Sequence, residues 1–355
     1  MSQQAGPRHS DAPHPPGLDL DRLRDHLDRT CPGMVDGTLT AELISGGKSN
    51  LTYRVHDDSH RWVVRRPPLG HVLATAHDMG REHRVISALA GTSVPVPGVH
   101  LLCTDAEVLG APFYVMDEVP GTVYRTAEDS AGLGAERART MSFRLMDVLA
   151  DLHGIDPEAV GLAGFGRPDG YLQRQLTRWL RQFEASRSRE IDGMAELQQR
   201  LADHLPTTQR NTVVHGDYRL DNAIIADDDT VAAVLDWEMA TLGDPLADLG
   251  LFKVYWEIAG DIPGNPVAQA VSPAAGFPGM DELAELYAAR TGLDLTPLPW
   301  YTAFAGFKLA VISEGIHFRY TQGKTVGEGF AHIGGLVPLL VAASLETLLK
   351  LEGNN

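Results

Sequence analysis

Cysteine is nearly absent from this chain of 355 residues, in which Cys31 and Cys103 are the only two. Two widely separated thiols form neither a disulfide framework nor a cysteine-rich zinc site, so we expect a reducing, cytoplasmic environment. Positive charge is also scarce, because 30 Lys and Arg stand against 47 Asp and Glu and give a net charge of -17. This balance repels phosphate backbones and anionic lipid, which argues against a nucleic-acid or membrane-surface partner.

Signals for export and for membrane insertion are lacking as well. The N-terminal sequence has no basic start followed by an apolar core, so we expect no signal peptide. Residues 1–17 are rich in Pro, Ser and His without apolar periodicity, and we predict a disordered tail. The apolar stretch 333–343 contains Gly334, Gly335 and Pro338, which predict a break, and it is too short to span a bilayer. We expect no membrane segment.

The rest of the chain has the composition of a folded protein with about two lobes, at 43% hydrophobic and 22% charged residues. Leu20, Leu23 and Leu27 recur at helical spacing and predict a short opening helix. Apolar periodicity predicts strands at 38–44, 51–55, 61–66, 99–103 and 113–116, and a helix at 78–90 that Asp78 can cap. Beyond residue 121 helices dominate, apart from short strands at 212–214, 223–226 and 231–235. The sequence predicts an α+β fold: an N-terminal lobe at 18–116 with an antiparallel sheet and one helix, a hinge at 117–121, and a larger, mostly helical lobe at 122–355.

Polar groups follow two of the short apolar strands, in the segments VVHGDYRLDNAII and VLDWE. We expect Asp217, Asn222 and Asp236 to converge on one small volume. Phosphoryl transfer from ATP requires a carboxylate that positions the acceptor hydroxyl and takes its proton, together with oxygen ligands for Mg²⁺. Asp217 suits the first role, and Asn222 and Asp236 are hard oxygen donors that suit the second.

The pattern HGDxxxxN, formed by His215, Gly216, Asp217 and Asn222, resembles the catalytic segment of the aminoglycoside phosphotransferase family. The resemblance implies a bilobal, protein-kinase-like fold, ATP and Mg²⁺ as cofactors, and a small-molecule substrate with a hydroxyl group. It also implies that Asp248, in GDPLADLG, holds the catalytic loop through hydrogen bonds. Asp244 in the same segment is expected to cap a helix ahead of Pro245.

Arg219 stands two residues after Asp217, where protein kinases place a lysine on the transferring phosphate. A cation at this point would neutralise charge that develops in the transition state. A salt bridge to Asp221 is the alternative role, and the sequence leaves both open.

The first lobe carries features of a nucleotide site. The loop SGGKSN joins two strands, and Gly47, Ser49 and Asn50 could cradle phosphates there. In WVVRRPP, Arg65 stands where kinases carry a phosphate-binding lysine, so the charge is kept and the geometry changes. By resemblance, Glu82 in REHRVISAL pairs with Arg65.

The segment PFYVMDEVPG looks like a kinase hinge. On that resemblance Met116 packs behind the adenine, while the Asp117 carbonyl and the Val119 amide bind its edge. The segments REHRVISAL, HGDYRLDN and EGIHFRYTQG look most like the phosphotransferase domain associated with acyl-CoA dehydrogenases. This narrower similarity moves the predicted acceptor from an aminoglycoside toward a hydroxy acid or a hydroxyacyl-CoA metabolite.

Other functions stay open on sequence alone. A pseudokinase would bind nucleotide without transferring phosphate, and a metal-dependent hydrolase could use His215, Asp217, Asp236 and Asp244. A protein kinase is disfavoured, because no APE-like segment follows Asp236. Substrate contacts are expected from the helical lobe, where the candidates are Glu314, His317, Arg319, Tyr320 and the arginines at 174, 178, 181, 187 and 189.

Overall fold

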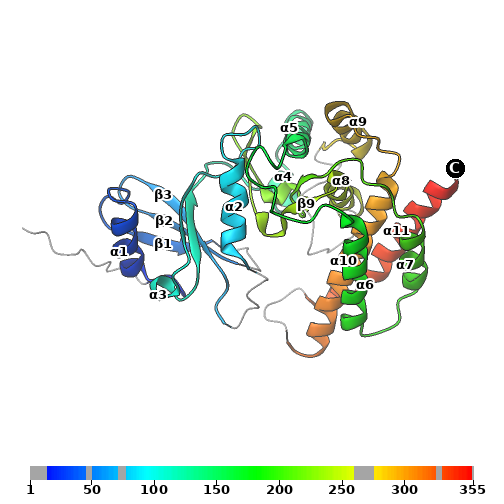
Figure 1. Cartoon of the computed structure of the whole chain (residues 1–355), viewed down its shortest axis with the longest axis horizontal. Coiled ribbons are helices and arrows are strands. Elements are labelled where there is room, and N and C mark those ends of the chain that lie inside the picture. Colours follow the sequence, from blue (N-terminus) through cyan, green and yellow to red (C-terminus); the bar gives the residue numbers. More distant parts are fainter. Residues whose placement is uncertain (1–13, 45–49, 71–76, 260–275, 325–329, 354–355) are drawn as a thin grey trace, which may run out of the picture. The chain divides into compact units, whose positions relative to one another are not determined.

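Two compact units make up the structure, a computed structural model that describes residues 14–44, 50–70, 77–259, 276–324 and 330–353 (Figure 1). Unit 1 contains Met1–Thr92, Val96–Pro120 and Asp236–Glu238. Unit 2 contains Ser93–Pro95, Gly121–Leu235 and Met239–Asn355. Each unit therefore includes a three-residue piece of chain flanked by residues of the other. Composition and periodicity give no signal for exchanges this short, and the predicted domain limits do not include them.

Unit 1 is built on a five-stranded antiparallel sheet of order β1-β2-β3-β5-β4. The strands are β1 (Thr40–Leu43), β2 (Leu51–His56), β3 (Arg61–Arg66), β4 (Val99–Cys103) and β5 (Phe113–Asp117). Three consecutive apolar residues of the central strand β3 are buried, Trp62, Val63 and Val64. A strand covered on both faces loses the alternation of apolar and polar residues that marks a half-exposed strand.

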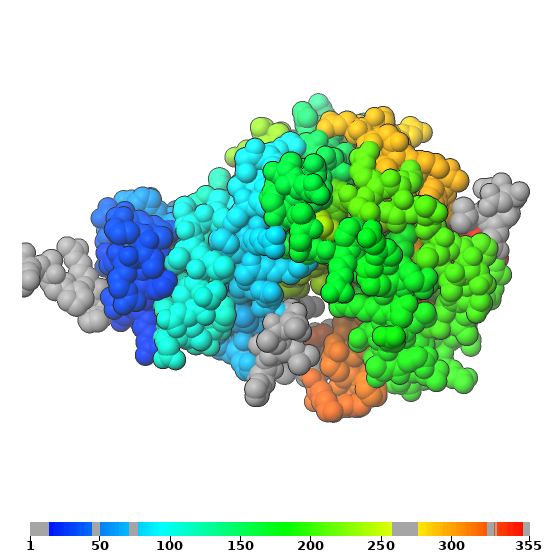
Figure 2. All heavy atoms as spheres, in the orientation of Figure 1, coloured from blue at the N-terminus to red at the C-terminus, as the bar shows by residue number. Residues whose placement is uncertain are grey.

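Three helices accompany this sheet in the described part of unit 1: α1 (Leu20–Thr30), α2 (Met79–Leu89) and α3 (Ala106–Leu109). The opening helix and the helix at 78–90 were predicted, and the one-turn α3 was not. Helix α1 buries Leu20, Leu23 and Leu27 in one cluster with sheet residues such as Tyr53 and Phe113. Its outer side lies at the surface of unit 1, where its atoms are dark blue in Figure 2. Burying three leucines contributes several kcal/mol and holds α1 on the sheet.

Residues 1–13 of the predicted tail lie outside the described residues. The Tyr53 hydroxyl donates to the Pro16 carbonyl at 2.6 Å, and Arg66 Nη1 donates to the Gly17 carbonyl at 2.5 Å. Arg66 is buried and also donates to the Leu109 carbonyl at 2.7 Å. The last residues of the predicted tail are therefore bound to the sheet, and Arg66 satisfies backbone groups rather than a ligand.

Unit 2 is mainly helical and carries two small sheets. Its longer helices are α5 (Ala135–Gly154), α6 (Tyr171–Ser186), α7 (Met194–Asp203), α8 (Pro245–Lys253), α9 (Met280–Thr291), α10 (Leu298–Thr321) and α11 (Ile333–Gly353), and α4 (Ala127–Ser130) is one turn. Strand β6 (Thr212–Val214) pairs with β9 (Thr241–Gly243), and β7 (Ala223–Ile225) pairs with β8 (Val231–Val234). Sequence analysis missed β9, because three residues are too few to show a period.

The predicted break near Pro338 is wrong, since α11 runs through Gly334, Gly335 and Pro338 without interruption. Proline lacks an N–H and leaves the carbonyl four residues earlier without its helical partner. Here that carbonyl belongs to Gly334, and the guanidinium of Arg189 donates to it instead. The tertiary contact replaces the missing hydrogen bond, so the helix continues.

The segment Ile333–Lys350 of α11 is long and apolar enough to cross a membrane by length and composition, contrary to the prediction of too short a stretch. It packs against α10 and α7 within unit 2, and 44% of it is buried. A helix in the interior of a water-soluble protein has the same length and composition, so this feature is weak support for a membrane span.

Candidate active site

The catalytic loop predicted from HGDxxxxN follows β6 in unit 2. Gly216 lies in this loop with a φ of 83°, a left-handed conformation that costs glycine little. A Cβ at this position would lie 2.7 Å from the Met239 carbonyl oxygen. The glycine is therefore required twice, for the turn itself and for the close approach of Met239, which lies just before β9.

Asp248, in the first turn of α8, holds this loop. Its Oδ2 accepts a hydrogen bond from the His215 amide at 2.6 Å, and its Oδ1 accepts from the Gly216 amide at 2.8 Å. His153 lies 3.2 Å from Oδ2 through Nε2, and its Nδ1 lies 2.7 Å from the Tyr287 hydroxyl. Burial opposes ionisation of Asp248, but these donors keep its pKa below the ordinary value. The loop-holding role implied by the resemblance is thus present in the geometry.

The start of α8 explains how Asp248 reaches the loop. Asp244 Oδ1 accepts from the Leu246 amide at 3.0 Å, with Pro245 in the first turn, so the predicted N-cap is confirmed. Its other oxygen accepts from the Tyr301 hydroxyl at 2.7 Å. With both oxygens used, Asp244 fixes the helix origin and leaves Asp248 one turn further on.

Asp248→Asn is expected to lower the free energy of unfolding by about 2–4 kcal/mol at pH 7, because an amide cannot accept two backbone hydrogen bonds and face His153 equally well. A carboxyl group whose pKa is depressed on folding stabilises above its unfolded value and loses this contribution as pH falls. The deficit of the variant should therefore shrink below about pH 4. Urea unfolding of both proteins from pH 3 to pH 8 measures this, and a deficit independent of pH would contradict the assignment.

The carboxylate of Asp217 has a defined orientation. Asn222 Nδ2 donates to the Asp217 carbonyl at 2.8 Å and to Asp217 Oδ2 at 3.1 Å. The Tyr255 hydroxyl donates to Oδ1 at 2.8 Å. Tyr255 lies in a π-helical stretch, η3 (Val254–Ala259), that continues α8. Such widened turns are frequent at functional sites, because they turn a side chain out of the regular helical register. Nothing in the sequence singled out Tyr255, since an aromatic residue in a helix is ordinary.

Arg219 makes the salt bridge that the sequence left open, with Nη2 2.5 Å from Asp221 Oδ2. Its Nε lies 3.9 Å from Asp217 Oδ2, and its guanidinium lies 4.8 Å from the centroid of the Tyr255 ring. Burial disfavours the charge of Arg219, yet the two carboxylates raise its pKa overall. Burial also raises the pKa of Asp221 to about 6, against the pull of Arg219. A role for Arg219 on the transferring phosphate stays a prediction.

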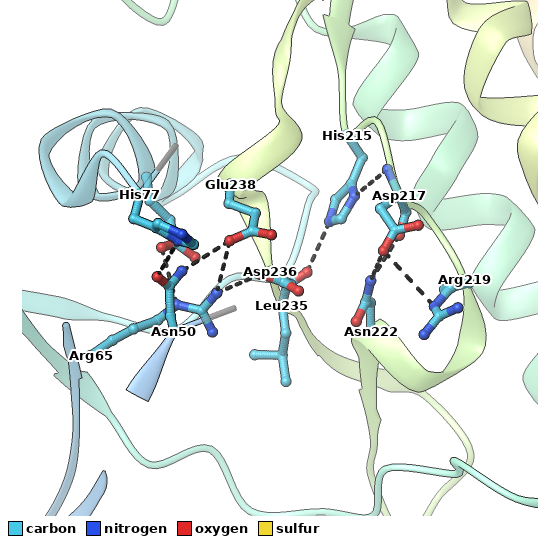
Figure 3. A network of polar contacts seen from close by, with 11 residues as sticks. Asn50, Arg65, His77, His215, Asp217, Arg219, Asn222, Leu235, Asp236 and Glu238 are labelled. Carbon is cyan, nitrogen blue, oxygen red and sulfur yellow. Dashed lines mark hydrogen bonds and ion pairs between the residues drawn. The ribbon is translucent and has the colours of Figure 1, made fainter. Parts of the chain in front are cut away.

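The ring of His215 is used within the fold. Nε2 lies 2.9 Å from the Leu235 carbonyl, and the Asp217 amide donates to Nδ1 at 3.2 Å (Figure 3). These contacts require the tautomer with the proton on Nε2, because Nδ1 accepts and Nε2 faces an acceptor. Both nitrogens are therefore occupied, and Asp244 serves as a helix cap. Two of the four residues of the hydrolase alternative are thus committed to structural hydrogen bonds.

The predicted cation of the nucleotide site lies in unit 1. Arg65 Nε lies 3.1 Å from Glu82 Oε2, and Nη2 lies 2.5 Å from Asp236 Oδ1. Glu82 stands in the first turn of α2, whose predicted N-cap Asp78 is confirmed by a 3.0 Å bond from the Arg81 amide. Burial, which leaves Glu82 1% exposed, raises its pKa, and Arg65 opposes that rise. The predicted pair of Arg65 and Glu82 is present, and Asp236 joins it.

Asp236 has a φ of 64°, a left-handed conformation that is uncommon for a residue with a side chain. The backbone then enters a short turn, η2 (Trp237–Met239). Strained conformations of this kind concentrate at functional sites, where surrounding contacts hold them. The contact between Asp236 and Arg65 is one such restraint in unit 1.

Two further polar residues of unit 1 were missed by sequence analysis. Asn50 Nδ2 donates to Glu238 Oε2 at 2.9 Å, and Asn50 Oδ1 lies 2.9 Å from His77 Nδ1 (Figure 3). Asn50 is 2% exposed. Its predicted partners in phosphate binding, Gly47 and Ser49, lie outside the described residues. Glu238 and His77 lie far from Asn50 in the sequence, and no local pattern joins them.

The predicted hinge residues end the strand β5 and continue past it. Met116 is buried, one residue before the end of β5. The Asp117 amide donates to the Gly98 carbonyl at 2.7 Å, and its carboxylate lies 2.6 Å from His100 Nε2. The Val119 amide makes no hydrogen bond within the described part of the chain. An unused backbone donor at this position is compatible with the predicted contact to adenine.

The two predicted metal ligands each keep an oxygen that accepts no hydrogen bond within the described residues. Asn222 uses its Nδ2 on Asp217, which leaves Oδ1 available, and Asp236 uses Oδ1 on Arg65, which leaves Oδ2. Amide and carboxylate oxygens fit Mg²⁺, which keeps several waters and needs few protein ligands. Across the described ranges no group of three or more His, Cys, Asp or Glu could hold a metal. The two available oxygens, from an amide and a carboxylate, are hard donors of the kind that Mg²⁺ prefers.

Three of the predicted substrate candidates, Glu314, Arg174 and Arg189, are used in hydrogen bonds within unit 2. Glu314 is fully buried and accepts from the Ser188 amide at 3.0 Å, from its hydroxyl at 2.7 Å and from Arg189 Nη2 at 3.2 Å. Arg174 donates to the carbonyls of Arg167 and Asp169. These side chains are used inside unit 2 and are poor candidates for ligand contacts.

A family model described as "Phosphotransferase enzyme family" matches residues 40–286. Acyl-CoA dehydrogenase family member 11 of Gallus gallus is 34% identical over 344 residues, which cover 94% of this chain and 44% of the relative. Acyl-CoA dehydrogenase family member 10 of Mus musculus is 36% identical over 312 residues, which cover 85% of this chain and 29% of the relative. The chain thus spans less than half the length of these two curated relatives.

Among solved structures, one from Ralstonia eutropha assigned to the aminoglycoside phosphotransferases has a TM-score of 0.81 and 32% identity, covering 94% of this chain and 98% of that one. The ternary complex of aminoglycoside phosphotransferase APH(4)-Ia with AMP-PNP and hygromycin B has a TM-score of 0.61 at 14% identity, covering 92% of this chain and 98% of that chain. At 14% identity, the similarity to APH(4)-Ia is evidence for the fold only. The predicted kinase-like α+β fold is confirmed by these neighbours.

Proposed function

Because the chain belongs to the phosphotransferase enzyme family, we propose that it transfers the γ-phosphate of ATP to a hydroxyl group of a small molecule. The observation that carries the proposal is the oriented carboxylate of Asp217, held by Asn222 and Tyr255 on a loop fixed by Asp248. An aspartate held in this way can accept a hydrogen bond from the acceptor hydroxyl and take its proton as the new P–O bond forms, while the bond from the γ-phosphorus to ADP breaks and ADP leaves.

The chain's other residues position the nucleotide. Arg65, braced by Glu82, would bind phosphate oxygens, and Asn50 and the Val119 amide would contact the nucleotide at the loop and the hinge. By the resemblance, Asn222 and Asp236 would each offer an oxygen to Mg²⁺, and the ion would supply charge neutralisation at the phosphates. Phosphoryl transfer asks little covalent chemistry of the protein, so positioning and electrostatics supply most of the rate.

We favour a hydroxy acid or a hydroxyacyl-CoA ester as the acceptor over an aminoglycoside. Support comes from the relatives, which are described as acyl-CoA dehydrogenase family members and match across 94% of this chain in the avian case. The fold alone does not determine the substrate, since APH(4)-Ia has the same fold and its structure contains hygromycin B.

A screen of nucleotide consumption tests the proposal. The panel contains aminoglycosides, amino alcohols, hydroxy acids and hydroxyacyl-CoA esters, each with ATP and Mg²⁺, and the phosphorylated product is identified by mass spectrometry. Turnover is expected with an acid or an acyl-CoA ester. It should vanish with EDTA, which competes for an ion held by few protein ligands, and return with excess Mg²⁺, because the ion neutralises the phosphate charge. Nucleotide binding without transfer to any acceptor would favour the pseudokinase instead.

A further inference from the structure

Lys308, in α10, lies beside the catalytic loop and forms no ion pair with a carboxylate of the described residues. Its Nζ donates to the Gly216 carbonyl at 3.2 Å, next to Asp217 in the chain, and lies 5.7 Å from the centroid of the Trp179 ring. No Asp or Glu of the described residues lies within ion-pair distance. Burial lowers the pKa of Lys308, and the charges of Asp217 and Asp248 oppose this shift. The ammonium group has three donors, and one of them is used by the loop.

Arg178, in α6, is a second cation near the same ring. Its guanidinium carbon lies 5.8 Å from the centroid of the Trp179 ring, and the side chain makes no ion pair with any described residue. It is exposed, and α6 contributes green atoms to the visible surface of unit 2 in Figure 2. Its charge is close enough to disfavour the charged form of Lys308. Neither cation forms an ion pair within the described residues, although the chain carries a net charge of -17.

Holding a loop carbonyl does not by itself explain this arrangement. A neutral donor could bind the Gly216 carbonyl without the desolvation cost of an ammonium group. Other arginines of unit 2 find partners, as Arg189 does with Glu314 and Arg290 with Asp151. The unused charges of Lys308 and Arg178 lie on the helices α10 and α6, which pack against each other within this unit.

We propose that Lys308 and Arg178 form an anion subsite that binds a carboxylate or phosphate group of the acceptor next to Asp217. The inference rests on the proposed function and narrows its substrate class to anionic acceptors. Such a subsite would attract a hydroxy acid or the phosphates of a hydroxyacyl-CoA, and it would repel a polycationic aminoglycoside.

Matched acceptor pairs test the subsite. Each hydroxy acid is compared with its own primary amide, and each hydroxyacyl-CoA with the hydroxyacyl-pantetheine that lacks the phosphates. In Lys308→Met the KM for the anionic member is expected to rise about 10- to 100-fold, from the loss of a charge-assisted hydrogen bond, with little change for the neutral member. The pair that shows the effect identifies the anion as carboxylate or phosphate. Lys308→Arg should retain the preference, and Lys350→Met, at an exposed pair with Glu346, is the control.

Equal loss of kcat for both members of every pair would overturn the subsite and leave Lys308 as a support for the loop. Calorimetric binding of the same acids and CoA esters is measured in parallel, so that the inference does not depend on turnover. Weaker anion binding by Lys308→Met supports the subsite even if no acceptor is phosphorylated, an outcome that would end only the proposed function. The subsite is overturned if Lys308→Met binds the anions as tightly as wild type, or if neither protein binds them. Arg178→Gln, at an exposed position, gives the same comparison if Lys308→Met does not fold.

Discussion

Asp217→Asn is expected to slow phosphoryl transfer by about 10²- to 10⁴-fold while leaving nucleotide affinity unchanged. The amide keeps the shape of the side chain and one oxygen for Tyr255 or Asn222, so the loop should persist. It cannot take the proton of the acceptor hydroxyl. The effect should therefore appear in kcat, measured on the acceptor found in the screen, with calorimetry reporting ATP binding.

A matched control is Asp228→Asn, which changes an exposed aspartate in the turn between β7 and β8. Its carboxylate accepts hydrogen bonds from the Thr230 amide at 3.1 Å and from the Thr230 hydroxyl at 2.6 Å. These bonds stabilise the turn and have no part in the catalytic loop. This variant should keep the wild-type rate. Full activity in Asp217→Asn would move the catalytic base elsewhere and remove the central residue of the proposal.

Arg65→Met is expected to abolish measurable nucleotide binding and to lower the free energy of unfolding by about 3–5 kcal/mol. The second effect arises because Glu82, fully buried in unit 1, loses the cation that balances it. Without Arg65 the pKa of Glu82 should rise further above its ordinary value. A carboxyl group with a raised folded pKa stabilises at low pH and loses this contribution as pH rises, so the variant should be least impaired below about pH 4.5.

A double variant separates the two effects. Arg65→Met with Glu82→Gln removes the unpaired charge, and most of the stability should return while nucleotide binding stays absent. Arg65→Lys keeps a charge at the same strand position. It is expected to bind nucleotide more weakly than wild type, because an ammonium group cannot make the bidentate hydrogen bonds of a guanidinium. Urea unfolding and ATP calorimetry on the three variants decide this. Normal ATP affinity in Arg65→Met would exclude a role for Arg65 at the phosphates.

Local patterns carried much of the fold and part of the site. The strands β2 and β3 and the caps Asp78 and Asp244 follow from residues that lie next to one another in the chain. The same holds for the pattern HGDxxxxN, since Asp217 and Asn222 are five residues apart and meet across one turn. A short spacing is visible in a sequence because backbone geometry converts it directly into a distance.

Contacts between distant segments were decided by tertiary structure alone. Tyr255 donates to Asp217 from 38 positions away, and Glu238 meets Asn50 across 188. The continuation of α11 through Pro338 depends on Arg189, which lies 145 residues from the carbonyl it binds. Lys308 reaches the catalytic loop across 92 positions. The sequence alone identified the reactive groups, which are the loop aspartate, the oxygen ligands and the strand cation. The side chains that hydrogen-bond to these groups or neutralise their charge were decided by packing. Packing brings together residues that no sequence period or spacing connects.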